Sequence, residues 1–237
     1  MSSGTNGHII CVRSLRKVYR AGDIEVEALR GVDLDVPRGE FLSIVGPSGS
    51  GKSTLFHVLG GLTPATGGSV EIDGVDLASM GEGGRTEMRK SKVGFVFQKY
   101  NLLPTLSAGD NIAIARHIAG KPLEADAWFK DVLKLLGIES RLHHKPRAMS
   151  GGEQQRVAIA RSIVNHPAIL LADEPTGNLD TKNSEAVLGV MRDLNRRMGQ
   201  TILMITHNPE AAAFGDRTVH MRDGRIVSQT PPAKRVA

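Results

Sequence analysis

A glycine-rich segment near residue 50 carries residue types that bind phosphate. It reads Gly46-Pro47-Ser48-Gly49-Ser50-Gly51-Lys52-Ser53 and matches the pattern G-x-x-x-x-G-K-[ST]. Glycines let backbone N–H groups surround phosphate oxygens, and the start of a helix adds partial positive charge. We expect Lys52 to reach the β- and γ-phosphates of a nucleoside triphosphate and the Ser53 hydroxyl to ligate Mg²⁺. Ser48 and Thr54 are expected to add hydroxyl contacts or to cap the following helix.

An acidic pair closes a second apolar run, Ile169-Leu-Leu-Ala-Asp173-Glu174. A strand that ends in a carboxylate places Asp173 at the C-terminal edge of a sheet, beside the phosphate loop. There Asp173 can hold the hydration shell of Mg²⁺, and Glu174 faces the position of an attacking water. Taken alone, such a pair is as often a helix cap, but the phosphate loop favours the chemical interpretation.

A third segment predicts another anion site. Ser150-Gly151-Gly152-Glu153 precedes a run with helical periodicity, so Ser150 is expected as N-cap and Glu153 as its capping-box partner. Such a helix start presents unpaired N–H groups and the positive end of the helix dipole. The chain therefore contains two separate segments suited to phosphate.

The elements that must position these residues alternate between short apolar runs and helical spacing. Predicted strands are Ile9–Leu15, Ala28–Val36, Phe41–Val45, Val70–Ile72, Val93–Phe97, Ile169–Ala172, Thr201–Ile205, Thr218–Met221 and Ile226–Ser228. Predicted helices are Ser53–Leu59 and Thr181–Met198, with further helical spacing between Ser107 and Val164. Asp223-Gly224 is typical of a two-residue hairpin turn.

This order predicts an α/β fold made of one domain, residues 1–237. A helical subdomain at about 99–164 is inserted into the α/β core, and residues 230–237 are expected to be frayed. The polar stretch Arg20–Glu27 is expected to separate the first two strands. Within the helical block, we expect Trp128, Val132, Leu135 and Leu136 to form one apolar face.

Composition limits the possible functions. The net charge of +5 invites a nucleic-acid interpretation, but the basic residues are scattered and aromatic residues make up only 4%. We therefore expect no dedicated nucleic-acid binding. The single cysteine excludes an intramolecular disulfide. The first residues do not resemble a signal peptide, and no apolar run reaches the roughly 18 residues of a membrane-spanning helix.

The motifs, taken in order, resemble those of ABC transporter ATP-binding subunits. Met149–Arg156 resembles the ABC signature and Gly177–Asp180 the D-loop. Gln98 after the strand VGFVF is similar to the Q-loop residue, and His207 after TILMIT to the switch histidine. Tyr19 matches the aromatic residue that stacks on adenine. Met149 and Asn208 replace the usual leucine and aspartate, which leaves the proposed catalytic groups in place.

The resemblance implies a P-loop ABC ATPase fold, with a mixed sheet core, an N-terminal antiparallel β-subdomain and an inserted helical subdomain. It implies that ATP and Mg²⁺ are bound and that two copies pair head to tail as a homodimer. Its site residues are then catalytic Glu174, His207, Gln98 and Lys52, metal-binding Ser53, Gln98 and Asp173, and nucleotide-binding Tyr19, residues 46–54, Ser150, Gly151, Gly152, Glu153 and Asp180.

Several further stretches look like the lipoprotein-release and macrolide-export subfamily. They are GDIEVEAL at Gly22–Leu29, Gly60-Gly61-Leu62, FVFQ at Phe95–Gln98, NLLPTL at Asn101–Leu106 and TGNLD at Thr176–Asp180. This resemblance implies a separate integral-membrane permease that extrudes lipids, lipoproteins or hydrophobic compounds. The chain is then expected in the cytoplasm, peripheral on the inner face of a bacterial membrane. The segment Asn101–Asn111 is expected to carry the groove for the permease.

Three alternatives remain open at this point. A cell-division or importer ATPase subunit would use the same chemistry for another task. A DNA-repair or chromosome-maintenance ATPase would place a long coiled coil or zinc module between Lys52 and Ser150, and neither pattern is present. A P-loop kinase or GTPase acting alone would lack the signature and D-loop segments.

Overall fold

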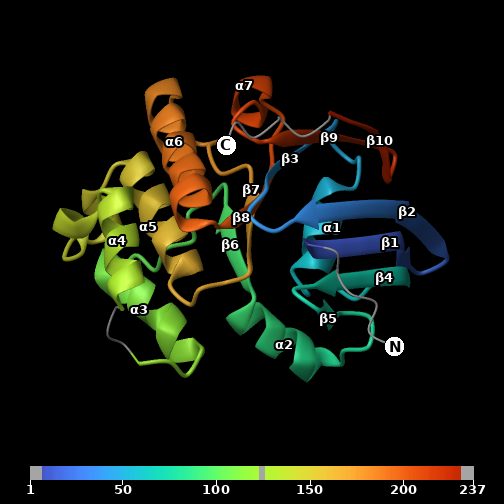
Figure 1. Ribbon diagram of the computed structural model, residues 1–237, viewed down its shortest axis with the longest axis horizontal. Coiled ribbons are helices and arrows are strands. Elements are labelled where there is room, and N and C mark those ends of the chain that lie inside the picture. Colours follow the sequence, from blue (N-terminus) through green and yellow to red (C-terminus); the bar gives the residue numbers. More distant parts are fainter. Residues whose placement is uncertain (1–6, 123–125, 231–237) are drawn as a thin grey trace.

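The strands form two sheets (Figure 1) in a computed structural model that describes residues 7–122 and 126–230. The expected frayed tail lies outside the described residues, apart from Thr230. The antiparallel sheet has the order β2-β1-β4-β5 and consists of β1 (His8–Ala21), β2 (Ile24–Pro37), β4 (Gly67–Ile72) and β5 (Val75–Asp76). The second sheet has the order β10-β9-β3-β8-β7-β6 and consists of β3 (Phe41–Val45), β6 (Val93–Phe97), β7 (Ile169–Asp173), β8 (Thr201–Ile205), β9 (Arg217–Arg222) and β10 (Arg225–Gln229).

The helices are divided between the two sides of the six-stranded sheet. They are α1 (Lys52–Leu59), α2 (Glu82–Ser91), α3 (Ala108–Ile118), α4 (Ala127–Leu136), α5 (Gly151–Ile163), α6 (Thr181–Met198) and α7 (Pro209–Ala212), with 3₁₀ turns at Glu139–Arg141 and Pro146–Ala148. Figure 1 shows α3, α4 and α5 gathered on one side, beside α6, and the antiparallel sheet on the other. Among the described residues, none of the helices combines the length and apolarity needed to span a membrane.

Two hydrophobic cores hold these layers together. One joins the antiparallel sheet and α1 to one face of the six-stranded sheet, and the other packs α3 to α6 against the opposite face. The inner strands β3, β7 and β8 are parallel and buried on both faces, which is why each is mostly apolar and shows no polar alternation. Their carboxyl ends meet at one edge of the sheet, where the phosphate loop begins.

The bounds of β3, β6, β8 and α6 agree with the sequence expectation. The expected polar separator at Arg20–Glu27 is wrong. β1 and β2 remain paired, with shifts in register, as far as Ala21 and Ile24, so this stretch is the tip of a hairpin. The hydrogen-bonded ladder and an ion pair between Arg20 Nε and Glu25 Oε1, 2.7 Å apart, hold the hairpin tip together without apolar burial.

The expected apolar face of α4 is also partly wrong. Val132 and Leu136 are fully buried, but Trp128 and Leu135 are only partly buried. Phe129 and Leu133 occupy the buried positions instead. The helical spacing was correct, and two of the four expected positions are fully buried.

Candidate nucleotide-binding site

The phosphate loop connects β3 to α1, and two of its glycines are required by space. At Gly46 the backbone φ is 153°, and a Cβ would lie 2.1 Å from the carbonyl oxygen of Met221. At Gly51 φ is 97°, and a Cβ would lie 2.6 Å from the carbonyl oxygen of Ala28. Helix α1 begins at Lys52 with no side-chain cap, so its first N–H groups remain available to an anion.

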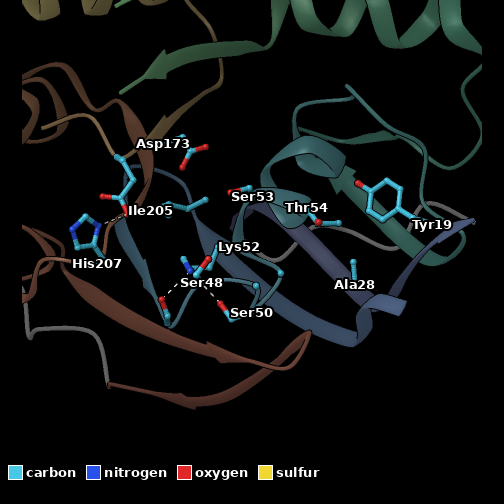
Figure 2. A pocket seen from close by; sticks show the side chains of 14 residues that line it. Tyr19, Ala28, Ser48, Ser50, Lys52, Ser53, Thr54, Asp173, Ile205 and His207 are labelled. Atoms are coloured by element: carbon cyan, nitrogen blue, oxygen red, sulfur yellow. Dashed lines mark hydrogen bonds and ion pairs between the residues drawn. The ribbon is translucent and has the colours of Figure 1, made fainter. Parts of the chain in front are cut away.

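The Lys52 ammonium lies folded over its own loop. Its Nζ donates to the carbonyl oxygen of Pro47 at 2.8 Å. It also donates to the carbonyl oxygen of Gly46 at 2.8 Å and to Ser50 Oγ at 3.2 Å (Figure 2). Burial lowers the pKa of Lys52, while the charges of Glu174 and Asp173 oppose that shift. Because all three acceptors are neutral, these bonds orient the ammonium without cancelling its charge.

The acidic end of the site follows directly from β7. Asp173 is the last residue of the strand, and burial and the charge of Glu174 raise the pKa of its carboxyl, against His57 and Lys52. Glu174 Oε1 lies 2.8 Å from His207 Nδ1, and the Glu174 N–H donates to the carbonyl oxygen of Ile205 at 3.0 Å.

Glu174 has a left-handed backbone, with φ at 49°. For a residue with a Cβ this conformation costs about 1–3 kcal/mol, and such strain gathers at functional sites. The hydrogen bond to the Ile205 carbonyl oxygen holds this backbone conformation in place, and the Glu174 carboxylate lies beside His207. Asp173 and Glu174 thus lie at one sheet edge, but only Glu174 contacts His207 and has a left-handed backbone.

These groups share one cavity of about 630 Å³, a size typical of small-ligand sites. Its lining consists of Tyr19, Ala28, Gly46, Ser48, Gly49, Ser50, Gly51, Lys52, Ser53, Thr54, Asp173, Glu174, Ile205 and His207. Figure 2 shows Tyr19 and Ala28 at one end, Asp173 and His207 at the other, and the phosphate loop between them. Twelve of the expected site residues therefore meet in this cavity, and Pro47 contributes through its carbonyl oxygen.

Gln98 lies outside the lining of this cavity. Its Nε2 donates to Asn178 Oδ1, and Asn178 Nδ2 donates back to the Gln98 carbonyl oxygen, both at 3.1 Å. Gly177 packs against the Gln98 side chain, since a Cβ on Gly177 would lie 2.7 Å from Nε2. In this structure Gln98 is therefore bound to the segment that follows Glu174.

The start of α5 is also outside the cavity. The expected capping box is present: Ser150 N donates to Glu153 Oε2 at 2.8 Å, and Glu153 N donates to Ser150 Oγ at 3.3 Å. The Ser150 N–H, with Arg141 Nε at 2.6 Å from Glu153 Oε1, lowers the pKa of Glu153. Gly151 lets the helix approach Tyr100 closely, because a Cβ at Gly151 would lie 2.7 Å from Tyr100 Oη. Gly152 does the same for Asn183, since a Cβ there would lie 2.6 Å from Asn183 Oδ1.

Asp180 caps a different helix. Its Oδ1 accepts from Asn183 N and its Oδ2 from Asn183 Nδ2, both at 2.8 Å, so it is the N-cap of α6. Asn208, the unusual residue after His207, caps α7 by accepting from Glu210 N at 2.8 Å. The sequence interpretation missed Ala28 and Ile205 in the cavity, because their side chains carry no chemical signal.

A glycine loop with its lysine, facing an acidic strand end, defines a P-loop nucleoside triphosphate site. Comparison with known proteins narrows this class. Residues 29–177 match the family model described as ABC transporter. An uncharacterized ABC transporter ATP-binding protein of Thermotoga maritima is 50% identical, covering 89% of this chain and 90% of the relative. The lipoprotein-releasing system ATP-binding protein LolD 2 of Caulobacter vibrioides is 47% identical, covering 93% of this chain and 97% of the relative.

A solved structure agrees with these relatives. The ATP-binding cassette MJ0796, described as a dimeric post-hydrolysis state bound to ADP and Pi, superimposes with a TM-score of 0.82. It is 36% identical, and the match covers 95% of this chain and 99% of that structure. The chain therefore belongs to the ABC transporter family. The expected ABC ATPase fold and the expected ATPase activity are confirmed.

Proposed function

We propose that this chain powers a separate membrane permease of the lipoprotein-release type, and that it works as a head-to-tail pair. The relative named as a lipoprotein-releasing system ATP-binding protein supports lipoprotein release as the transport task. The proposed cargo is lipids, lipoproteins or hydrophobic compounds. A subunit that drives such a permease acts in the cytoplasm, at the inner face of the membrane.

One observation carries the pairing. The Ser150–Glu153 helix start has the geometry of an anion site, but none of its residues lines the cavity that holds Lys52, Asp173 and Glu174. Mg-ATP keeps about two negative charges, and Lys52 offsets one of them; a helix N-terminus supplies about half a charge more. A second copy, turned head to tail, brings its Ser150 end over the γ-phosphate, and its Asp180 lies at the same interface. The dimeric state of MJ0796 supports the pairing of two copies.

The lining of the cavity supports one direction for the bound nucleotide. Tyr19, with 39% of its surface exposed and Lys17 Nζ 4.9 Å from its ring centre, offers its ring to the adenine. The N–H groups of the glycine loop then surround the phosphates. Lys52 exchanges its loop carbonyls for the β- and γ-phosphate oxygens, because a charged acceptor binds an ammonium more strongly than a neutral one.

The residues present fit a magnesium ion. The Ser53 hydroxyl and the Asp173 carboxylate are oxygen donors of the kind Mg²⁺ prefers, and both line the cavity. Burial and the charge of Glu174 raise the pKa of Asp173, so a cation beside this carboxylate would stabilise its ionised form. When bound, Mg²⁺ neutralises charge on the β- and γ-phosphates. Gln98 joins this set only after its amide leaves Asn178.

Hydrolysis uses the Glu174–His207 pair. Water attacks the γ-phosphorus in line, the bond to the β-phosphate oxygen breaks, and the water proton passes to the Glu174 carboxylate. His207, 2.8 Å from Glu174, orients the water and contacts the γ-phosphate. Lys52 and the Ser150 end of the partner stabilise the charge as it moves to ADP and phosphate.

A neighbouring groove is our candidate for the site at which the permease binds. It has a volume of about 420 Å³ between α2, β6, α3 and α5, with Phe95, Phe97 and the exposed Ile118 beside Arg89 and Arg161. The segment Asn101–Asn111, where the sequence predicts the groove, lies between lining residues Phe97 and Ala115 in the chain but does not line this groove. Hydrogen bonds within the segment fix its conformation. Asn111 is fully buried, and its amide bonds Leu103 N at 2.7 Å and the Leu103 carbonyl oxygen at 3.1 Å.

The variant Glu174→Gln tests pairing and catalysis together. The glutamine keeps the shape of the side chain but cannot accept the proton, so turnover falls by about 10²–10⁴-fold. ATP should then hold the variant as a dimer in size-exclusion chromatography with light scattering, and ADP should not. Turnover at the wild-type rate, or a monomer in saturating ATP, contradicts the proposal.

Ile118→Glu tests the permease groove. We expect unchanged ATPase activity of the isolated subunit and loss of the stimulation produced by the reconstituted permease. Ile24→Glu is the matched control, since Ile24 is similarly exposed but lies on the distant β1–β2 hairpin. Equal stimulation of both variants contradicts the assignment of the groove.

A further inference from the structure

Gln155 is a fully buried amide in the middle of α5. Its Nε2 donates to the carbonyl oxygen of Phe97 at 3.3 Å and to that of Pro175 at 2.7 Å. Phe97 immediately precedes Gln98, and Pro175 immediately follows Glu174. One side chain on the α5 helix therefore ties together the two backbone segments that carry the proposed water-positioning residue and the proposed base.

The other end of this amide is not satisfied. Gln155 Oε1 is buried and has no hydrogen-bond partner among the described residues. A buried acceptor without a partner lowers stability, so an apolar side chain of similar size would suit the core at least as well. Filling the core therefore does not account for an amide at this position, whereas the two bonds made by Nε2 do.

Further hydrogen bonds hold the segment around Gln98 in place. Gln98 and Asn178 exchange hydrogen bonds in both directions. Arg161, further along α5, donates to the Tyr100 carbonyl oxygen at 3.0 Å and to that of Asn101 at 2.6 Å. Helix α5 thus holds the chain on both sides of Gln98, and a displacement of the helix moves that segment with it.

We propose that Gln155 is a positioning residue that couples the two ATP sites of the pair. This inference rests on the proposed head-to-tail dimer. There, the Ser150 end of α5 contacts the nucleotide of the partner, while Gln155 on the same helix sets Gln98 and Glu174 of its own subunit. Binding of ATP at one site shifts α5, and Gln155 passes that shift to the catalytic groups of the other site. Such coupling is reciprocal and produces positive cooperativity in ATP.

Gln155→Met tests the coupling, because methionine retains the size of the side chain but has no N–H to donate. The readouts are kcat, the KM for ATP, the Hill coefficient and the melting temperature, at a protein concentration where the wild type is paired. We expect kcat to fall by about tenfold or more, as misplaced catalytic groups do. The Hill coefficient should fall from above 1 to about 1, with KM changed by less than about threefold.

Asn195→Leu is the matched control. Asn195 is another buried bridging amide, whose Nδ2 donates to the Gly39 carbonyl oxygen at 2.8 Å and to that of Gln200 at 2.9 Å, far from the catalytic groups. It should lower the melting temperature and leave the Hill coefficient unchanged. If Gln155→Met fails to fold, Gln155→Asn replaces it, since an amide one methylene shorter cannot reach both carbonyls.

Two results overturn the proposal. One is a Gln155 variant with wild-type kcat and a wild-type Hill coefficient. The other is a Gln155 variant in which kcat falls only in proportion to thermal stability, as in Asn195→Leu, while cooperativity is retained. A wild-type protein that is itself non-cooperative and active as a monomer refutes the head-to-tail dimer instead, so the two failures are distinguishable.

Discussion

Replacing Gly46 by alanine should damage the fold of the phosphate loop far more than the same change at Gly49. The added Cβ would lie 2.1 Å from the Met221 carbonyl oxygen and 2.9 Å from Ser50 Oγ, at a φ of 153°. Overpacking of this kind costs about 1–3 kcal/mol. A strained backbone adds about 1–3 kcal/mol. We therefore expect the free energy of unfolding to fall by about 4 kcal/mol.

Gly49→Ala provides the control. Gly49 also has a positive φ, 76°, but a Cβ there meets nothing within 4 Å, so only the backbone term of about 1 kcal/mol applies. For a chain of this size, 1 kcal/mol lowers the melting temperature by about 2–4 °C. The expected decreases are then about 8–16 °C for Gly46→Ala and about 2–4 °C for Gly49→Ala.

Differential scanning calorimetry without nucleotide measures both decreases, because nucleotide binding would itself shift the melting temperature. Equal melting temperatures for the two variants would refute the reasoning. They would mean that β9, which contains Met221, does not press against Gly46.

Three further predictions concern charge and stacking. Glu153→Ala should lower the free energy of unfolding by about 1 kcal/mol at neutral pH. Because the pKa of Glu153 is lower in the folded chain, this difference from wild type should persist above the ordinary value of 4.5 and disappear as the pH falls through the folded pKa. Urea titrations at several pH values measure it. Glu40→Ala should cost about 3–5 kcal/mol, since it removes the buried carboxylate that the mostly buried Arg217 guanidinium contacts at 3.0 Å. Asp35→Ala, which breaks an exposed pair with Arg13, should cost under about 1 kcal/mol by the same assay. Tyr19→Ala should weaken ATP binding by about 1–3 kcal/mol in calorimetric titration, while Tyr19→Phe keeps the ring; an unchanged affinity in both contradicts adenine stacking.

The six-stranded sheet was the most predictable part of the fold. β3 and β8 are five-residue, mostly apolar runs, and burial on both faces leaves no polar alternation to confuse the pattern. Helix α6 was predicted with its bounds because Asp180 caps its start and Gly199 its end. The residues of these elements therefore mark their positions in the sequence.

The antiparallel hairpin was harder to predict because its alternation is broken. β1 changes register between Val12 and Leu15, and Ser14 there has a φ of 47°. Helix α2 was missed for another reason. Gly83 and Gly84 lower its helix propensity, and the helix is held by buried Met88 and by Arg89 Nη1, which donates to the Gly61 carbonyl oxygen at 2.6 Å.

The candidate site likewise has a part that the sequence predicts and a part that it does not. Motif spacing was enough to predict which groups gather at the phosphate loop, because each motif contains its own strand end or helix start. The bond of Gln98 to Asn178, the left-handed backbone of Glu174 and the bridge made by Gln155 could not be predicted. Each depends on a contact or a backbone conformation produced by segments distant in sequence.

The ATPase rate per chain, measured against protein concentration, tests the central claim most directly. If each active site is completed by the Ser150 end of a second copy, the rate per chain should rise steeply as light scattering shows monomers becoming dimers, and then level off. A rate per chain that stays constant down to concentrations where only monomers are present would contradict the account.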